Sequence, residues 1–371
     1  MPMIARVLTI LALVISPALA QPALEDLLRN GQQELHQAKF PNASETFRRA
    51  SVSYPTHPAP VFFQGLVDLW QLLYFGYDPV VVAKLTSNAR AAVGKAEAMV
   101  RDTQASGPLL WRAMSRSLLV AAALSSDLLK QTKEPALLSA LRRMAAFGET
   151  RAARADFRLA LQINPKLHDA RLMLVLLGPC LADDITQCIE SLWKAADDPQ
   201  WVRVEVKYVL LSLLYGRALP EELATRAIPL VLGLHVQYPS NGLFHVGLAK
   251  MYYEAGNREE CKAECSRILR SATQYAGAFH HEARYFLGVI AFEDNDCRTA
   301  SRLFGEILNA SPRQPDYLVP WSNLRAAQCE ITSGNFERAI MFAQNALKSA
   351  NGTDVRRLAE QLLSDANSRK R

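Results

Sequence analysis

Residues 42–55, Asn-Ala-Ser-Glu-Thr-Phe-Arg-Arg-Ala-Ser-Val-Ser-Tyr-Pro, decide the fold. They space a small residue, an aromatic ring, a second small residue and a proline as A-x3-F-x2-A-x4-P. The spacing returns at Ala153, Phe157, Ala160 and Pro165, and again at Ala300, Phe304, Ile307 and Pro312. A pattern that recurs at distant points predicts a chain built from one repeated unit.

In the last copy, Leu287 and Gly288 precede Ala300 by thirteen and twelve residues. The whole arrangement resembles the tetratricopeptide repeat (TPR), a 34-residue unit with L-G-x2-Y, then A-x3-F, then a proline. The resemblance implies an all-α, right-handed superhelical solenoid of antiparallel helix pairs. The chain is similar to divergent TPR proteins exported by Gram-negative bacteria, and distantly to the tetratricopeptide repeat protein 39 group.

A 34-residue ruler laid along the chain predicts its organisation. The matching windows are residues 24–57, 134–167, 168–201, 208–241, 242–275, 281–314 and 320–353. The predicted parts are a signal peptide (1–20), a first TPR-like unit (21–57), a long-helix insertion (58–133), degenerate TPR-like units (134–241), C-terminal TPR units (242–353), and a terminal helix with a basic tail (354–371).

The physical basis of the unit is the close approach of two helices. A small residue on the first helix, such as Gly31, Ala249 or Gly288, lets the second helix come near. The aromatic residue of the second helix fills the space between neighbours, and the proline ends that helix. One pair cannot bury its apolar face alone, so pairs must stack. The alternative is an irregular helical bundle with chance Ala-x3-Phe matches.

Residues 58–133 do not fit the ruler. They predict helices near 61–75, 79–103 and 108–131, which would pack on the solenoid as a cap or lobe. Residues 61–75 are strongly apolar, but their polar side chains recur along one helical stripe, which favours a buried amphipathic helix over a membrane span. A peripheral contact of this segment with lipid stays open as an alternative.

The first twenty residues have the layout of a secretory signal peptide. A short segment with one cation, Arg6, precedes an apolar run, and Ala18-Leu19-Ala20 gives an A-x-A cleavage pattern. A mitochondrial presequence or an uncleaved anchor fits less well. We therefore expect an exported protein, periplasmic in a Gram-negative bacterium or secreted.

Composition excludes several classes of protein. The chain has 371 residues, of which 50% are hydrophobic and 21% charged, so it is globular and not disordered. The formal net charge is only +6. The densest basic group is interrupted by Glu149 and Asp156, so solvated helix faces explain it better than nucleic-acid binding.

Catalytic motifs are missing from the sequence. It contains no phosphate-binding glycine loop, no zinc-protease helix and no nucleophile elbow. His280-His281-Glu282 is the nearest approach to a metal cluster, but adjacent histidines on a helix point about 100° apart. We expect no cofactor, no metal and no enzymatic activity. The alternative is an enzyme on a helical scaffold that uses the acidic residues Glu254, Glu282 and Glu293.

The six cysteines invite pairing in an oxidising compartment. Cys180 and Cys188 lie at facing ends of two predicted antiparallel helices, so they are the preferred disulfide. Cys261 and Cys265 occupy packing sites on one helix and read as buried thiols. Either could reach Cys297, which would leave Cys329 unpaired.

The function is expected in the concave face, which the first helices of the pairs line in a TPR superhelix. The last three units offer an aromatic stripe edged with charge: Lys250, Tyr253, Glu254, Glu282, Tyr285, Phe292, Glu293, Trp321, Leu324 and Gln328. Such a stripe suits a partner peptide or helix from another protein. The alternative is that the rings only pack between repeats. Leu28 and Gln32 stand where chaperone-binding TPR domains carry their carboxylate clamp, so chaperone tails are not implied.

Overall fold

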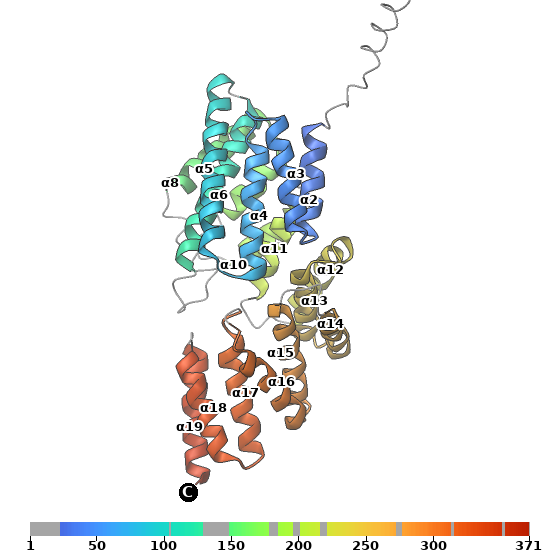
Figure 1. Ribbon diagram of the computed structural model, residues 1–371, viewed down its shortest axis with the longest axis vertical. Coiled ribbons are helices and arrows are strands. Elements are labelled where there is room, and N and C mark those ends of the chain that lie inside the picture. The colour runs from blue at the N-terminus through green and yellow to red at the C-terminus, as the bar shows by residue number, and fades with distance from the viewer. Residues whose placement is uncertain are drawn as a thin grey trace, which may run out of the picture.

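The computed structural model describes residues 23–103, 105–128, 148–177, 185–195, 201–215, 221–271, 277–312, 315–350 and 353–370. The regular structure in these ranges is entirely helical, and Figure 1 gives the helix labels used below. The predicted signal peptide, residues 1–20, lies outside them.

The helices run in the following order. They are α2 (Leu24–His36), α3 (Phe40–Ser53), α4 (Ala59–Phe75), α5 (Pro79–Asp102), α6 (Ser106–Leu128), α8 (Gly148–Ile163), α9 (His168–Leu176), α10 (Ile185–Ala195), α11 (Arg203–Tyr215), α12 (Glu221–Gln237), α13 (Gly242–Glu254), α14 (Arg258–Arg270), α15 (Gly277–Glu293), α16 (Cys297–Ala310), α17 (Leu318–Thr332), α18 (Phe336–Ser349) and α19 (Thr353–Lys370).

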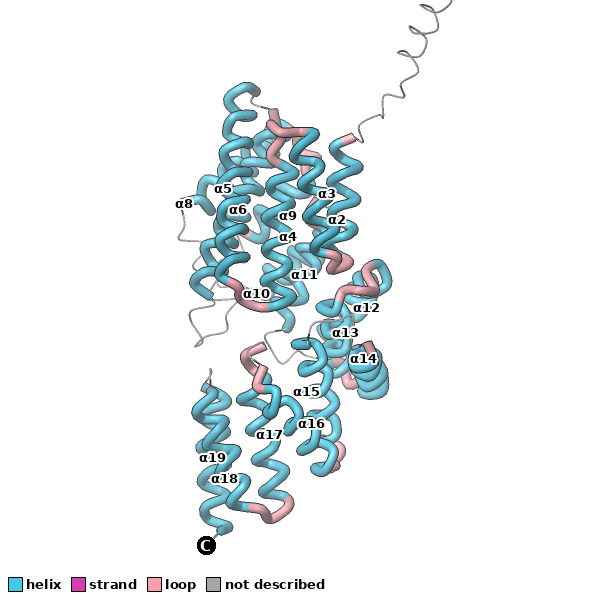
Figure 2. Tube along the Cα trace, in the orientation of Figure 1, coloured by secondary structure: helices cyan, strands magenta, loops and turns pink. Residues whose placement is uncertain are grey.

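Consecutive helices pack against each other in pairs, and the pairs stack. In the C-terminal part, α13, α15 and α17 are the first helices of their pairs, and each contacts the next one along. Figures 1 and 2 show α2 to α6 side by side in one block, α12 to α14 at its side, and α15 to α19 beyond them. The predicted all-α solenoid of stacked helix pairs is confirmed.

Four turns inside the pairs share one geometry. Each has a residue with φ in the left-handed region, seven positions after the small residue of the first helix: Ala38, Gly256, Asn295 and Gly334. In each turn the next N–H reaches the carbonyl five residues back, as Lys39 N–H does to Glu34 O at 2.9 Å. This bond satisfies a carbonyl that the helix end leaves free. The same turn therefore occurs at the same position of four helix pairs, as expected for a repeated unit.

The small residue and the aromatic residue of a pair are in direct contact. A Cβ atom built on Gly288 would lie 2.8 Å from Cε1 of Phe304, and Gly31 faces Phe47 in the same way. The aromatic rings are fully buried. Phe47 also stacks on Phe63 of α4, with 5.2 Å between ring centroids. The ring thus joins the two helices of its own pair to the following pair.

Prolines stand two residues beyond the ends of α3, α8, α12 and α16, at Pro55, Pro165, Pro239 and Pro312. The residue before a proline is pushed out of the helical region, so each proline stops the second helix at the same point of the unit. The turn to the next pair begins there.

The helices of residues 58–133 lie in series with the first pair. Helix α4 pairs with α5 and contacts α2 and α6, while α6 packs on α5 and α8. Arg112 and Arg116 of α6 both bind the buried carboxylate of Asp156 on α8, the former with two hydrogen bonds of 2.6 and 2.8 Å. The division of the chain into named units stays a prediction.

Helix α4 is buried on nearly all sides. Phe63, Leu66 and Trp70 are in the core, and Asp68 of the predicted polar stripe accepts a 2.8 Å hydrogen bond from Asn88 Nδ2. Asp68 thus faces α5, while Gln64 of the same stripe donates to the carbonyl of Ser44 on α3. Of the large apolar side chains of α4, only Leu73 and Phe75 are exposed, so most of the surface that a lipid contact would use is already covered. Within the described ranges, no helix has the length and apolar character needed to cross a bilayer.

The inner faces of α2 and α4 are covered by a later part of the same chain. Glu205 of α11 accepts hydrogen bonds from His36 Nε2 at 2.7 Å and from Trp70 Nε1 at 3.3 Å. Asn241 Nδ2 donates to the carbonyl of His36 at 2.9 Å. Trp70 also packs on Tyr208, with ring centroids 5.2 Å apart. The concave side of the first two pairs is thus filled by α11 and by the turn before α13.

The contact between small and aromatic residues gives a first prediction. Gly288→Ala should lower the thermal midpoint, because Phe304 must move and overpacking of this kind costs about 1–3 kcal/mol. Gly305→Ala on α16 is the matched control, since no atom lies within 4 Å of its added Cβ. It should be neutral or stabilising by up to about 1 kcal/mol. Equal melting curves for the two variants would contradict the close contact.

The closure onto α11 gives a second prediction. Glu205→Ala should destabilise the protein by about 1–3 kcal/mol, because it leaves the buried donors of His36 and Trp70 without their acceptor. Glu360→Ala, at an exposed position of α19, should leave the thermal midpoint unchanged. A Glu205→Ala variant as stable as Glu360→Ala would show that the closure does not hold the first pairs in place.

Candidate protein-binding groove

The predicted groove residues lie on α13, α15 and α17. These helices contact one another in order. Glu293 is exposed, and Lys250, Glu282 and Leu324 are buried. The others are partly exposed: Tyr253, Glu254, Tyr285, Phe292, Trp321 and Gln328.

Between α13 and α15, a tyrosine and two acidic residues are held together. Tyr253 Oη donates to Glu293 Oε1 at 2.5 Å, and Arg258 Nη2 lies 2.9 Å from the other oxygen of Glu293. Lys250 Nζ pairs with Glu254 at 2.6 Å. Burial, together with the hydrogen bond to Glu293, raises the pKa of Tyr253 well above its ordinary value. Tyr253 is therefore a neutral donor at any physiological pH.

Between α15 and α17, Glu282 is buried, with 5% of its surface exposed. Tyr317 Oη donates to Glu282 Oε1 at 2.8 Å, and the ring of Tyr317 meets that of Tyr285 edge to face at 5.6 Å. Burial raises the pKa of Glu282 to about 7, although the Tyr317 hydrogen bond and the charge of Lys250 oppose this. Glu282 thus titrates near neutral pH.

Arg325 on α17 has the most unusual surroundings in the groove. Its Cζ lies 5.0 Å from the ring centroid of Phe292 and 6.0 Å from that of Trp321. Its Nη1 donates to Gln328 Oε1 at 3.0 Å, while Nε is buried without a hydrogen-bond partner. Among the salt bridges of the described residues, none involves Arg325. The groove therefore holds a cation that is oriented by rings and lacks a carboxylate.

The residues predicted from the sequence lie on three helices that contact one another in order. Arg325 and Tyr317 were missed, since an arginine or a tyrosine at a turn gives no signal without its neighbours. Leu324 does not line the groove: it is 2% exposed and packs with Val355 and Ala359 of α19. The aromatic rings both touch each other across the repeats and keep part of their surface free. Binding by these residues stays a prediction.

The acidic residues of the enzymatic alternative are each engaged by other side chains. Glu254 pairs with Lys250, Glu293 with Tyr253 and Arg258, and Glu282 with Tyr317. Glu282 and Glu293 thus link neighbouring helices, whereas the pair of Lys250 and Glu254 lies within α13.

The described cysteines Cys261, Cys265, Cys297 and Cys329 are free thiols. The thiol of Cys329 is hydrogen-bonded with that of Cys297, and burial raises the pKa of Cys329 to about 12. Cys329 therefore has Cys297 as its neighbour but is a free thiol, as expected, and neither Cys261 nor Cys265 is bridged to Cys297. Cys180 and the side chain of Cys188, the preferred disulfide, lie outside the described part of the chain.

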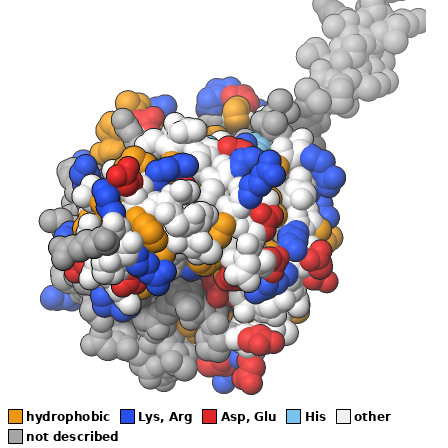
Figure 3. Space-filling model, turned by 90° about the horizontal axis from the view of Figure 1, so that it is seen from below, with side chains coloured by type: hydrophobic (Ala, Val, Ile, Leu, Met, Phe, Trp, Pro, Cys, Tyr) orange, Lys and Arg blue, Asp and Glu red, His pale blue; other side chains and the backbone are white. Residues whose placement is uncertain are grey.

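Charged side chains of both signs are intermixed on the face shown in Figure 3, and hydrophobic side chains gather there only in small groups. The same mixture holds in the groove, where Lys250 and Arg325 lie among Glu254, Glu282 and Glu293. The surface thus has neither a wide basic stripe nor a wide acidic one on this face.

No known protein-family model matches the chain, and no curated protein matches its sequence. Solved structures resemble its fold. The TPR domain of P58(IPK) is 13% identical, covers 93% of this chain and 98% of its own, and has a TM-score of 0.30. A TPR protein from Parabacteroides merdae is 13% identical, covers 92% of this chain and 98% of its own, and has a TM-score of 0.31. Yeast Tom70 is 13% identical, covers 95% of this chain and 89% of its own, and has a TM-score of 0.31. TM-scores this low say nothing of how the pairs are arranged. The stacked helix pairs of this chain are shown by its own repeated turns and contacts.

The pKa of Glu282 gives a third prediction. The folded protein binds a proton here at pH values where the unfolded chain does not, so the free energy of unfolding falls as pH rises from about 4.5 to about 7. The total change is up to about 3 kcal/mol. Glu282→Gln removes this dependence, and its thermal midpoint should rise relative to that of the wild type between pH 5 and pH 8.

Glu260→Gln, at an exposed position of α14, is the control and should follow the wild type at every pH. A difference between Glu282→Gln and the wild type that stays constant with pH would show that Glu282 ionises normally in the folded protein.

Proposed function

We propose that this protein is a non-catalytic binding adaptor or assembly scaffold, and that the groove of α13, α15 and α17 binds a peptide or helix of another protein. The observation that carries the proposal is Arg325, held between Phe292 and Trp321 without a carboxylate partner. The TPR-type fold supports a role in protein interaction, since stacked pairs form extended concave surfaces.

The chemistry of the groove favours a particular ligand. A guanidinium offers several donors in a fixed plane and binds carboxylates with two hydrogen bonds. Two aromatic rings hold Arg325 in one orientation, so little side-chain freedom is lost on binding. We therefore propose a partner segment with a carboxylate, from an acidic side chain or a chain end, next to an apolar residue that covers Trp321.

In the described part of the N-terminal half, the faces of α2 and α4 that would bind a partner are already occupied. The inner faces of α2 and α4 already bind Glu205, Tyr208 and Asn241 of the same chain. A partner would have to displace these buried contacts. The C-terminal groove is the concave surface that remains for another protein.

The proposed location is the cell envelope. The apolar run and Ala-Leu-Ala pattern of residues 1–20 support export to the periplasm or the medium. The partner would then be another envelope or secreted protein. The electrostatic attraction between Arg325 and an acidic segment does not depend on this location.

A photo-crosslinking experiment gives a fourth prediction. Benzoylphenylalanine placed at Gln328 of α17 should give a discrete protein adduct in cells that make the full chain. Gln344 of α18, an exposed residue on the second helix of the same pair, is the matched control position and should give none. Arg325→Ala should reduce the Gln328 adduct at least about tenfold, as expected for a central interface residue.

Arg270→Ala removes an exposed arginine of α14 and should leave the adduct unchanged. The same adducts from Gln328 and Gln344, or an adduct that survives Arg325→Ala, would reject the groove as the binding site.

A further inference from the structure

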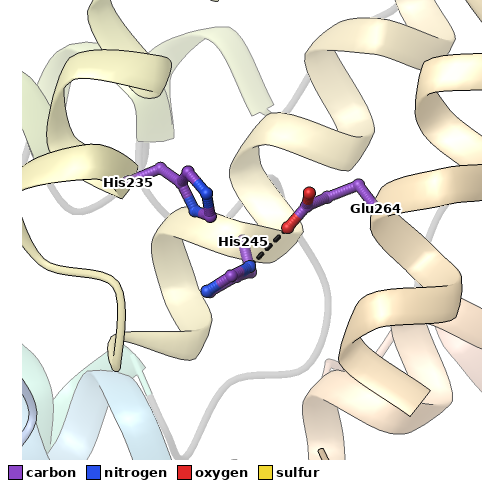
Figure 4. A group of neighbouring side chains, drawn as sticks. All are labelled: His235, His245 and Glu264. Carbon is purple, nitrogen blue, oxygen red and sulfur yellow. Dashed lines mark hydrogen bonds and ion pairs between the residues drawn. The ribbon is translucent and has the colours of Figure 1, made fainter. Parts of the chain in front are cut away.

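Three side chains from three consecutive helices converge beside the turn between α12 and α13. His235 lies on α12, His245 on α13 and Glu264 on α14, and Figure 4 shows the two rings and the carboxylate turned toward one another. One nitrogen of each histidine and one oxygen of Glu264 all lie within 4.8 Å of one another. These residues are ten and nineteen positions apart in sequence, and no short spacing rule for metal ligands picks them out.

His245 is oriented as a metal-binding histidine would be. Its Nε2 donates to the carbonyl of Pro239 at 2.9 Å, which fixes the ring and turns Nδ1 toward Glu264 Oε1. Histidine ligands of metals commonly donate their second N–H to a backbone carbonyl in this way. The other carboxylate oxygen of Glu264 is held by Arg267. His245 and Glu264 therefore already have the hydrogen bond and the ion pair that would orient them as metal ligands.

His235 has a buried nitrogen whose lack of a partner is not explained if no metal binds there. Its Nδ1 is buried and has no hydrogen-bond partner, although an unsatisfied buried polar atom costs about 1–3 kcal/mol. The ring meets that of His245 at a centroid distance of 4.2 Å and an angle of 89°.

We infer that His235, His245 and Glu264 form a binding site for one divalent transition-metal ion, with Zn²⁺ the best match. Two imidazole nitrogens and one carboxylate oxygen are a common protein ligand set for zinc, and a water molecule completes the tetrahedron. Metal–ligand bonds of about 2.0–2.2 Å require the three atoms to draw slightly closer, and His235, which is only half-buried, can move. The ion would replace the hydrogen bond between His245 and Glu264.

The proposed site lies at a junction between helix pairs. It joins α12, α13 and α14, which belong to two successive pairs, close to the point where Asn241 binds the carbonyl of His36. A bound ion would therefore stabilise the junction between the closed N-terminal part and the groove helices. The proposal is independent of the partner suggested for the groove.

The test is Zn²⁺ titration of the full chain after chelator treatment, followed by calorimetry and by the thermal midpoint. The wild type should bind one Zn²⁺ at this site with a dissociation constant below about 10 µM, and its midpoint should rise with zinc by linkage. His235→Ala removes a ligand but no hydrogen bond, so it should fold normally without metal. It should bind Zn²⁺ at least about 100-fold more weakly and lose the shift in midpoint.

His281→Ala is the matched control, because His281 on α15 is also half-buried with an unpartnered Nδ1. It should bind Zn²⁺ as the wild type does. If His235→Ala proves unstable, Glu264→Gln decides by the same measurements. Equal Zn²⁺ binding by the wild type and the ligand variants, binding lost only in Cys261→Ser, or no binding by the wild type would each overturn the site.

Discussion

The fold depends on one contact, between a residue without a bulky side chain on the first helix of a pair and a larger residue sixteen positions on, on the second helix. Gly288 against Phe304 is the clearest case. Where the ring is absent, Ala249 and Cys265 take the same positions, and both are fully buried. The distance between the two helices sets the length of the turn between them, and the proline after the second helix sets the entry to the next pair. Stacking follows because the same ring also reaches the next pair.

Repetition explains how much of this could be read from the sequence. Contacts inside a pair and between neighbours are local, so spacing alone predicts them, including the helices of the groove. The closure of α11 onto α2 and α4 is a different case. His36 and Glu205 are 169 residues apart, and neither belongs to a repeated motif. Only the curvature of the whole stack brings them together, and no local pattern encodes that curvature.

The residues of the candidate sites also fall into two groups: those whose positions repeat along the sequence, and those that only the folded structure brings together. The aromatic residues of the groove could be listed because their positions repeat from unit to unit. The surroundings of Arg325 come from the nearby rings of Phe292 and Trp321, and Leu324 is buried because α19 packs on it. Both therefore depend on packing between helices, which the repeated motif does not specify. The cluster of His235, His245 and Glu264 needs three helices in place at once. Sequence analysis found the adjacent histidines of α15 instead, because adjacency is what a sequence displays.

Closure also affects the order in which the molecule can fold. In most stacked-repeat proteins each pair can form as soon as its neighbour exists, and folding spreads from any starting point. Here the ring of Trp70 packs on that of Tyr208, and the ring of Tyr74 packs on that of Phe279 with 4.7 Å between centroids. Contacts between residues this distant in sequence slow folding. The N-terminal pairs must therefore remain incomplete during synthesis until most of the chain has been made, and a protein of this design has greater need of chaperones than an open solenoid of the same length.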